Sequence, residues 1–312
     1  MGKGLGKVAL VGPGAVGGFY GGMLVNSGVD LNFVFRSSYV DVCRKGLWIV
    51  HHSDGCREEK VEPLHSFCDP LEIGECDWVI VAIKSTANDQ LEEILKPLVG
   101  PSTRFLTLQN GMGNVENLAN AFGCKRTILA GLCFTCINRT KPNRIESLLP
   151  GYVQFGQYGC GLSELAEEMV FAFEEAGIKV KRAESLDEVL WRKLCWNVPF
   201  NGLAIACGGI TTDRILSNAG HRSRASRLMK EIQAAALTHE IAIEDSFLVR
   251  QFDLTEPMGS YKPSSLIDYL DGKSVEVETI WGEPLRRGES KGLEMSELRQ
   301  LYDELKTLTQ GK

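Results

Sequence analysis

The stretch that decides the fold is Lys7-Val-Ala-Leu-Val-Gly12-Pro-Gly14-Ala-Val-Gly17-Gly18, near the start of the chain. A short apolar run ends at Gly12, and the three numbered glycines before Gly18 follow the G-x-G-x-x-G spacing. Each glycine has a physical reason: a tight turn after a strand, close approach of backbone to a pyrophosphate, and close packing of strand against helix. The N–H groups of the following helix would face the phosphates. The stretch therefore predicts a dinucleotide-binding turn formed by Gly12, Pro13, Gly14, Ala15, Val16 and Gly17.

Apolar runs and helical patterns alternate over the first 180 residues or so, which is typical of a parallel sheet flanked by helices. The expected strands are Val8–Val11, Leu31–Phe35, Trp78–Ile83, Arg104–Leu108, Ile128–Leu132, Tyr152–Gln157 and Lys179–Arg182, with an antiparallel excursion over 46–66. The expected helices are Ala15–Asn26, Ala87–Leu98, Val115–Ala121 and Leu162–Ala176, then 185–206, 219–241, 245–253, 264–271, 276–287 and 294–309. We therefore predict an α/β protein in which a Rossmann-type doubly wound sheet (1–182) is followed by an all-helical domain (183–312).

Bulk composition excludes several classes of protein. The net charge of −6 argues against a general nucleic-acid role, which needs a basic surface. The longest apolar runs, such as Trp78–Ile83, are far too short to span a membrane, so we expect a cytoplasmic protein. Ten cysteines are scattered without a disulfide or zinc framework, so no metal site is predicted. The apolar face of the last helix packs either inside its domain or at a homodimer interface.

The end of the second expected strand indicates which nicotinamide cofactor is used. An NAD site generally places an Asp or Glu there to hold the ribose 2′-hydroxyl. This chain instead reads Phe35-Arg36-Ser37-Ser38. A guanidinium can bind a 2′-phosphate that a carboxylate would repel, so we predict NADP rather than NAD.

Three polar residues form a stripe on the first long helix of the second domain. Lys193, Asn197 and Asn201 are spaced four residues apart, so they span only about 80° of the helix surface. Their neighbours on that surface are apolar, and polar groups buried there must find partners. A bound polar ligand would supply them, and a hydrogen-bonded seam between helices is the alternative. Two loops also follow strands, Lys84-Ser85 and Gln109-Asn110-Gly-Met-Gly113, and both would border the cofactor.

Taken together, these motifs resemble the ketopantoate reductase family nearly end to end. The matching residues are Gly12 to Gly18 with Arg36, Ile83-Lys84, Gln109 to Gly113, Lys193 with Asn197 and Asn201, and Pro263-Ser264-Ser265 with Asp268, Gly272 and Glu276. The resemblance implies NADPH-dependent reduction of a 2-oxo acid, 2-dehydropantoate, to (R)-pantoate on the route to pantothenate and coenzyme A. It implies that Lys193 is the general acid and Glu276 its catalytic partner. It also implies that Asn110, Asn197, Asn201 and Ser264 contact substrate or nicotinamide, and that Lys84 lies where cofactor and substrate meet. Counting back from Asp268 favours Ser264 over Ser265.

Other readings of the same residues remain open. The same fold and mechanism would serve a reductase of another branched 2-oxo acid, that is, a D-2-hydroxy-acid dehydrogenase. A non-catalytic NADP-binding sensor is a possibility of another class, but such a protein has no need for the general acid Lys193 or for Glu276. A sugar-phosphate dehydrogenase is disfavoured because no second basic cluster marks another phosphate site. The physiological 2-oxo acid is therefore the main question.

Overall fold

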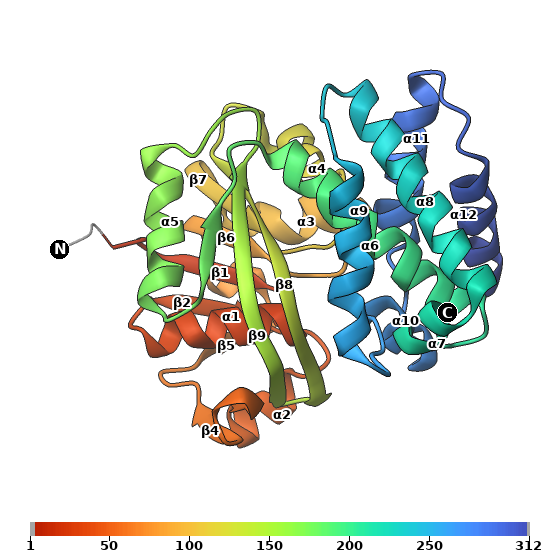
Figure 1. Cartoon of the computed structure of the whole chain (residues 1–312). Helices are drawn as coiled ribbons and strands as arrows, with labels where there is room; N and C mark the ends of the chain where they lie inside the picture. The colour runs from red at the N-terminus through yellow and green to blue at the C-terminus, as the bar shows by residue number, and fades with distance from the viewer. Residues whose placement is uncertain (1–3, 311–312) are drawn as a thin grey trace. The chain divides into compact units, whose positions relative to one another are not determined.

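The computed structural model describes residues 4–310, so the outermost ends of both predicted domains, 1–3 and 311–312, lie outside the described residues (Figure 1). The chain divides into two units. Unit 1 comprises the residues up to Gln109 together with Asn114–Leu186, and unit 2 comprises Asn110–Gly113 and the residues from Asp187 onward. We expected a single boundary between residues 182 and 183. The assignment of Asn110–Gly113 to unit 2 departs from that expectation, because this loop makes its contacts with helical residues of unit 2.

Unit 1 is built around one sheet, which has ten strands within the described residues. Its strands are β1 (Val8–Val11), β2 (Leu31–Val34), β3 (Trp48–His51), β4 (Arg57–Lys60), β5 (His65–Phe67), β6 (Cys76–Val81), β7 (Val99–Thr107), β8 (Ile128–Lys141), β9 (Arg144–Gln157) and β10 (Val180–Arg182). The parallel part runs in the order β5-β2-β1-β6-β7-β8. From β1 the chain moves outward in one direction and returns to β6 to move in the other. The switch point, where doubly wound folds bind ligands, therefore lies between the adjacent central strands β1 and β6.

The helices of unit 1 cover both faces of this sheet (Figure 1). They are α1 (Ala15–Asn26), α2 (Tyr39–Lys45), α3 (Leu91–Leu95), α4 (Asn114–Phe122) and α5 (Glu164–Glu175). Helix α1 packs against α5 and strands β8 and β9, whereas α4 packs against α3 and strands β7 and β8. Right-handed crossovers require this division, because β1-α1-β2 and β7-α4-β8 proceed in opposite directions along the sheet. The expected Rossmann-type fold is therefore confirmed.

Several elements differ from the sequence prediction. Two expected short strands are the ends of a long antiparallel hairpin, β8–β9, in which both strands have 14 residues. Its outer part carries mixed polar and apolar side chains that are partly exposed, and so lacks the apolar run of a buried strand. The expected helix Ala87–Leu98 is broken into η3 (Ser85–Gln90), α3 and η4 (Lys96–Leu98), the last containing Pro97. The antiparallel excursion over 46–66 is confirmed as the pairing of β3 with β4.

Unit 2 is built of helices joined by loops, with no strand among its described residues. Its elements are α6 (Leu186–Ala206), α7 (Thr212–Ser217), α8 (Ala219–Thr238), α9 (Asp245–Thr255), η5 (Glu256–Met258), α10 (Ser264–Leu270), η6 (Glu278–Gly282), α11 (Glu283–Ser290) and α12 (Ser296–Thr309). The apolar stripe of α12 is packed inside the unit, because Leu298, Leu301 and Leu305 are fully buried. These three leucines therefore pack inside their own unit, which is the first of the two possibilities for this helix.

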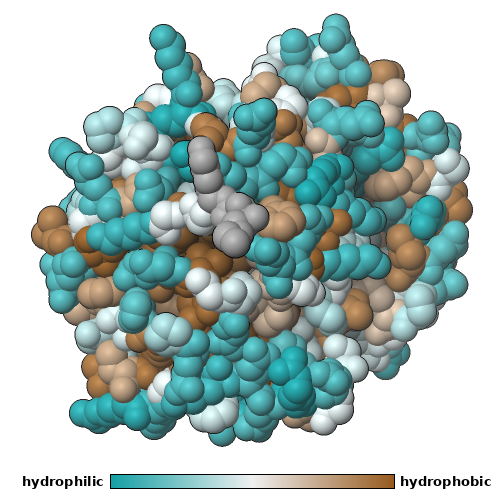
Figure 2. All heavy atoms as spheres, turned by 90° about the vertical axis from the view of Figure 1, so that its left-hand side faces the viewer, coloured by the Kyte–Doolittle hydropathy of each residue, from teal (hydrophilic) through white to brown (hydrophobic). Residues whose placement is uncertain are grey.

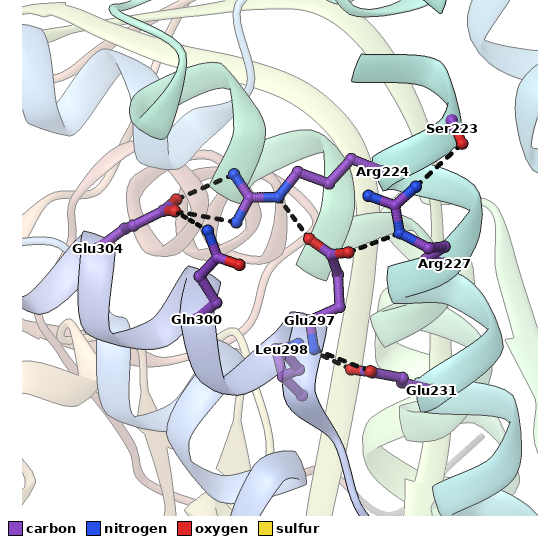
Figure 3. A network of polar contacts seen from close by, with 8 residues as sticks. All are labelled: Ser223, Arg224, Arg227, Glu231, Glu297, Leu298, Gln300 and Glu304. Atoms are coloured by element: carbon purple, nitrogen blue, oxygen red, sulfur yellow. Dashed lines mark hydrogen bonds and ion pairs between the residues drawn. The ribbon is translucent and has the colours of Figure 1, made fainter. Parts of the chain in front are cut away.

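A polar network joins α12 to α8 (Figure 3). The guanidinium of Arg224 bridges Glu297 and Glu304, at 2.7 and 3.0 Å. Arg227 also donates to Glu297, at 2.6 Å. The side chains of Arg224 and Glu297 are only 16% and 15% exposed, so this pair is shielded from solvent far better than an ordinary surface ion pair.

Hydrophilic side chains dominate the face shown in Figure 2, with apolar ones interspersed among them. Across residues 4–310, no helix combines the length and apolar character needed to cross a membrane.

Candidate cofactor and substrate site

The glycine-rich turn follows β1 and faces the segment after β6. Gly12 has a φ of +83°, and a Cβ at this position would lie 2.6 Å from the backbone nitrogen of Ile83. Any side chain would therefore collide with backbone that cannot move away. The turn is closed by the Gly14 N–H, which donates to the Gly12 carbonyl at 2.7 Å. Gly12 is thus required both by its backbone conformation and by the neighbouring strand.

Gly14 and Gly17 differ in what surrounds them. A Cβ at Gly17 would lie 2.6 Å from the Ala82 Cβ, so this glycine allows α1 to pack on the sheet. At Gly14 the nearest atom to such a Cβ is the Gly12 carbonyl oxygen, at 3.9 Å. Gly14 also occupies the N-cap position of α1 without a side-chain cap. The turn therefore leaves open space beside uncapped N–H groups, which is what a pyrophosphate needs.

Pro13, in the middle of this turn, is held by a residue that we did not predict. Arg139 of β8 donates from Nη1 to the Pro13 carbonyl at 2.7 Å. Its Nε is buried without a hydrogen-bond partner among the described residues, and burial lowers the pKa of this arginine. A lone arginine in a polar stretch of sequence gives no signal for such a role, since 126 positions separate it from Pro13.

Arg36 follows β2 and is exposed, as is Ser37, whereas Ser38 is buried at the N-cap of α2. The guanidinium is thus available to solvent at the carboxyl end of a strand beside the switch point. Lys84 is half-buried at the N-cap of η3, directly after the segment that follows β6. Both residues lie in unit 1 with the glycine-rich turn.

The polar stripe lies on α6 in unit 2, as its spacing predicts. Its apolar neighbours are buried, including Val189, Leu194 and Phe200. Lys193 is half-buried, and its Nζ donates to Oδ1 of Asn110 at 3.2 Å. The structure therefore brings together two candidate residues that are 83 positions apart in the sequence.

The two asparagines of the stripe have different surroundings. Asn201 is 3% exposed, and its Oδ1 accepts the backbone N–H of Ser265 at 3.1 Å. Asn197 is 9% exposed, and its side chain has no hydrogen-bond partner within residues 4–310. The alternative of a hydrogen-bonded seam between helices thus describes Asn201, whereas the Asn197 side chain is left available to a ligand. Ser264, the first residue of α10, is exposed, and Ser265 is buried.

The sequence predicts Glu276 in the first turn of a helix, but the structure does not place it there. Glu276 precedes the helical residues, and its carbonyl accepts the Ile280 N–H at 3.2 Å. The next turn, η6, has π geometry instead of the α-helix that the apolar spacing of 276–287 indicates. Sequence periodicity does not distinguish one wide turn from an α-helical turn, so the prediction missed it.

These features define a class of protein. A doubly wound dinucleotide-binding unit is joined to a helical unit in which a lysine and an amide side chain contact each other. Family comparison agrees with this class. Residues 8–159 match the family model described as "Ketopantoate reductase PanE/ApbA", and residues 185–309 match that of its C-terminal domain. The chain belongs to the ketopantoate reductase family.

Individual relatives support the same assignment. A 2-dehydropantoate 2-reductase of Nostoc sp. is 34% identical over 97% of this chain and 95% of its own length. The crystal structure of a 2-dehydropantoate 2-reductase from Geobacter metallireducens GS-15 is also 34% identical, with a TM-score of 0.92 over 96% of this chain and 99% of that one. A D-mandelate dehydrogenase with NADH and anilino(oxo)acetate has a TM-score of 0.87, covering 97% of this chain and 98% of that one. Its sequence identity of 18% shows a shared fold only.

Proposed function

We propose that this protein is an NADP-dependent 2-dehydropantoate 2-reductase, which reduces the ketone of 2-dehydropantoate to (R)-pantoate. The observation that carries the proposal is the contact between Lys193 Nζ and Asn110 Oδ1, 3.2 Å apart, next to the buried amide of Asn197 on the same helix. A lysine ammonium has three N–H donors, so it can donate to Asn110 and still provide a proton for the substrate, which a reductase needs and a passive nucleotide sensor does not. Family membership supplies the substrate class.

In this proposal unit 1 and unit 2 have different tasks, and their bounds replace the expected boundary between residues 182 and 183. Unit 1 would hold NADP through Gly12, Pro13, Gly14, Ala15, Val16 and Gly17, with Arg36 on the 2′-phosphate and Lys84 near the nicotinamide. Asn110, which belongs to unit 2, would also contact the nicotinamide. The open space at Gly14 and the uncapped start of α1 fit a pyrophosphate. The exposed guanidinium of Arg36 fits a 2′-phosphate. When bound, the reduced cofactor supplies the hydride.

Unit 2 would supply the proton and bind the substrate. Addition of hydride to a ketone carbon leaves negative charge on the ketone oxygen. The Lys193 ammonium would donate a hydrogen bond to that oxygen as its charge grows, and then transfer the proton that completes the alcohol. Glu276 would orient the ammonium and the substrate hydroxyl. Asn110, Asn197, Asn201 and Ser264 would bind the remaining polar groups of the substrate.

The proposal includes a cytoplasmic location, where a soluble 2-oxo acid and the cofactor are both available. The proposed chemistry draws on residues of one chain, and does not depend on the homodimer that the sequence left open.

Substrate discrimination tests the proposal. Ketopantoate has a terminal hydroxyl that 2-oxoisovalerate lacks, and buried polar groups that bind this hydroxyl would lose their partner with the simpler acid. We therefore expect kcat/KM for ketopantoate to exceed that for 2-oxoisovalerate by at least about 100-fold. Steady-state NADPH oxidation against a panel of 2-oxo acids measures the ratio. Equal efficiencies, or a preference for an aromatic 2-oxo acid, would indicate a broader D-2-hydroxy-acid dehydrogenase, and no turnover would indicate a sensor.

The general acid can be tested separately. Lys193→Ala should lower kcat by about 10²- to 10⁴-fold because no group remains to protonate the alkoxide. NADPH binding, followed by fluorescence, should stay near the wild-type value, since the proposed cofactor residues lie mainly in unit 1. Arg192→Ala is the matched control, because Arg192 is the adjacent cation of α6 and pairs with Glu188 at 2.8 Å. Retention of most turnover in Lys193→Ala would refute the assigned role.

A further inference from the structure

The turn η6 changes the hydrogen-bond register of the helix that follows Glu276. The Ile280 N–H donates to the Glu276 carbonyl, four residues back, as in an α-helix. The Glu283 N–H donates to the Glu278 carbonyl, five residues back. A π turn is a rare form of helix and is frequent at functional sites. In this register the Glu283 N–H no longer reaches the Thr279 carbonyl, its usual partner in an α-helix.

Pro284 removes the other helical donor that could reach Thr279. In the π register the carbonyl of residue 279 would accept the N–H of residue 284, and proline has none. The Thr279 carbonyl instead accepts the Met112 N–H at 2.8 Å. The π register and Pro284 together thus direct one helical carbonyl toward the loop Asn110–Gly113, which belongs to the same unit.

The loop approaches this carbonyl as closely as a backbone can. Gly111 has a φ of +85°, and a Cβ there would lie 2.5 Å from both the carbonyl carbon and the carbonyl oxygen of Thr279. The adjacent Met112 is 1% exposed. Only glycine at position 111 permits both the backbone conformation and the close approach.

The same turn also contacts the helix of the polar stripe. The indole Nε1 of Trp281 donates to the Val198 carbonyl at 2.9 Å, in the buried interior and one residue after Asn197. The turn η6 therefore holds the loop on one side and α6 on the other. Asn110 lies on that loop and Lys193 on α6, and their side chains meet at 3.2 Å.

We propose that η6 is a positioning device that sets Asn110 against Lys193, with Gly111, Thr279 and Pro284 as positioning residues. This inference rests on the proposed reductase function, because it concerns how the proton donor is oriented. The displaced Thr279 carbonyl fixes the Gly111–Met112 peptide, and the fixed peptide aims the Asn110 side chain at the ammonium. The register of one helical turn is thereby linked to the geometry of the proton donor.

Gly111→Ala tests the close approach. Misplacing the donor by about 1 Å costs up to about 100-fold in rate, so we expect kcat of the folded variant to fall about 10- to 100-fold while the Kd for NADPH changes little. Gly208→Ala is the matched control, since Gly208 also has positive φ, at +91°, but nothing lies within 4 Å of its Cβ position. The control carries the backbone strain without the collision. Equal kcat values for the two variants would overturn the proposal.

Pro284→Ala tests the register. The new N–H at 284 can compete with Met112 for the Thr279 carbonyl, so amide hydrogen exchange at Met112 should accelerate about tenfold or more. We expect kcat to fall with it, while the KM for the 2-oxo acid changes less. Pro257→Ala, at the start of exposed η5, is the control for removing a proline from a helical turn. Unchanged Met112 exchange in Pro284→Ala would overturn the proposal. Absence of reductase activity in the wild-type protein would contradict the proposed function. The rates of amide exchange at Met112 would still show whether η6 holds the loop Asn110–Gly113.

Discussion

Asn197 and Asn201 lie about one helical turn apart on α6, yet within the described residues only the Asn201 side chain has a hydrogen-bond partner. Asn201 accepts a backbone N–H from α10, so its amide belongs to the packing of unit 2. Asn197 is nearly as deeply buried and has no such partner within the described residues. Because no residue of the described fold engages its amide, Asn197 can offer both its N–H donors and its oxygen acceptor to a ligand. This makes Asn197 the better candidate for substrate contact.

Arg36 should decide which cofactor the protein prefers. A hydrogen bond to a charged group contributes about 1.5–3 kcal/mol, so Arg36→Ala should raise the KM for NADPH roughly 10- to 100-fold. The KM for NADH should change little, because NADH has no 2′-phosphate. Initial rates with both cofactors measure this. Arg44→Ala, which removes an exposed cation of the neighbouring helix α2, is the control. Equal losses for NADPH and NADH in Arg36→Ala would remove this residue from the 2′-phosphate site.

Single residues were predictable where their chemistry acts locally. The spacing of Gly12, Gly14 and Gly17 encodes a turn, and the spacing of Lys193 and Asn197 encodes one face of a helix. Arg139 and Thr279 could not be found in this way, since Arg139 acts through a contact between distant strands and Thr279 through its backbone carbonyl. Neither role depends on a pattern that neighbouring residues display.

Among the helices, α12 has an unusual N-terminus. Its N-cap residue, Met295, provides no side-chain acceptor. The carboxylate of Glu231 on α8 instead accepts the N–H groups of Glu297 and Leu298, at 2.9 and 2.7 Å (Figure 3). An acceptor from another helix thus satisfies the free donors of the first turn, and its negative charge also suits the positive end of the helix.

Removing this cap should destabilise unit 2. Loss of an N-cap acceptor costs about 0.5–2 kcal/mol, so Glu231→Ala should lower the free energy of unfolding by about that amount. Glu231→Gln keeps one acceptor oxygen and should retain part of it. Denaturant titration followed by tryptophan fluorescence measures the change. Asp303→Ala, an exposed change on the capped helix α12, should have a smaller effect. Glu231→Ala with wild-type stability would contradict the capping role.

Elements were predictable to the extent that their patterns are regular. Strand β1 and helix α1 lie at the expected residues because an apolar run and a glycine turn mark both. The hairpin β8–β9 was underestimated because its outer half is partly exposed and its residues are mixed. Pairing with a neighbouring strand, rather than a local pattern, extends these strands to 14 residues.

At the scale of the whole molecule, the candidate residues separate by unit. The glycine turn, Arg36 and Lys84 belong to unit 1, whereas Lys193, Asn197, Asn201, Ser264 and Glu276 belong to unit 2. Asn110 is the exception: it follows a strand of unit 1 in sequence but belongs to unit 2. The order of motifs predicted the doubly wound and helical parts of the fold. It could not predict that this loop belongs to unit 2, because that assignment depends on contacts with residues distant in sequence, such as the Met112–Thr279 and Lys193–Asn110 hydrogen bonds.

Protonation of Glu297 at low pH should lower the free energy of unfolding. Burial opposes ionisation of this carboxyl, but hydrogen bonds from Arg227 and Arg224 outweigh it and hold the pKa of Glu297 below its usual value. The folded state therefore stays ionised at pH values where the unfolded chain has already bound the proton. The resulting stability is complete above the ordinary carboxyl pKa of about 4.3. It is lost as the pH falls through the lower pKa of the folded state.

Glu297→Gln tests this by comparing stability at two pH values. The variant should be less stable than the wild type at pH 7 by about 1–2 kcal/mol, since the amide cannot pair with two guanidinium groups. The difference should shrink as the pH falls from 7 toward 3, because below about 4.3 the unfolded chain binds the proton and the stability linked to the lowered pKa of folded Glu297 is progressively lost. Urea titrations between pH 7 and pH 3 measure the gap. Glu294→Gln, an exposed carboxylate in the loop before α12, should show no such convergence. A gap for Glu297→Gln that stays constant across this range would mean that shape, and not charge, makes Glu297 important to the packing of α12 on α8.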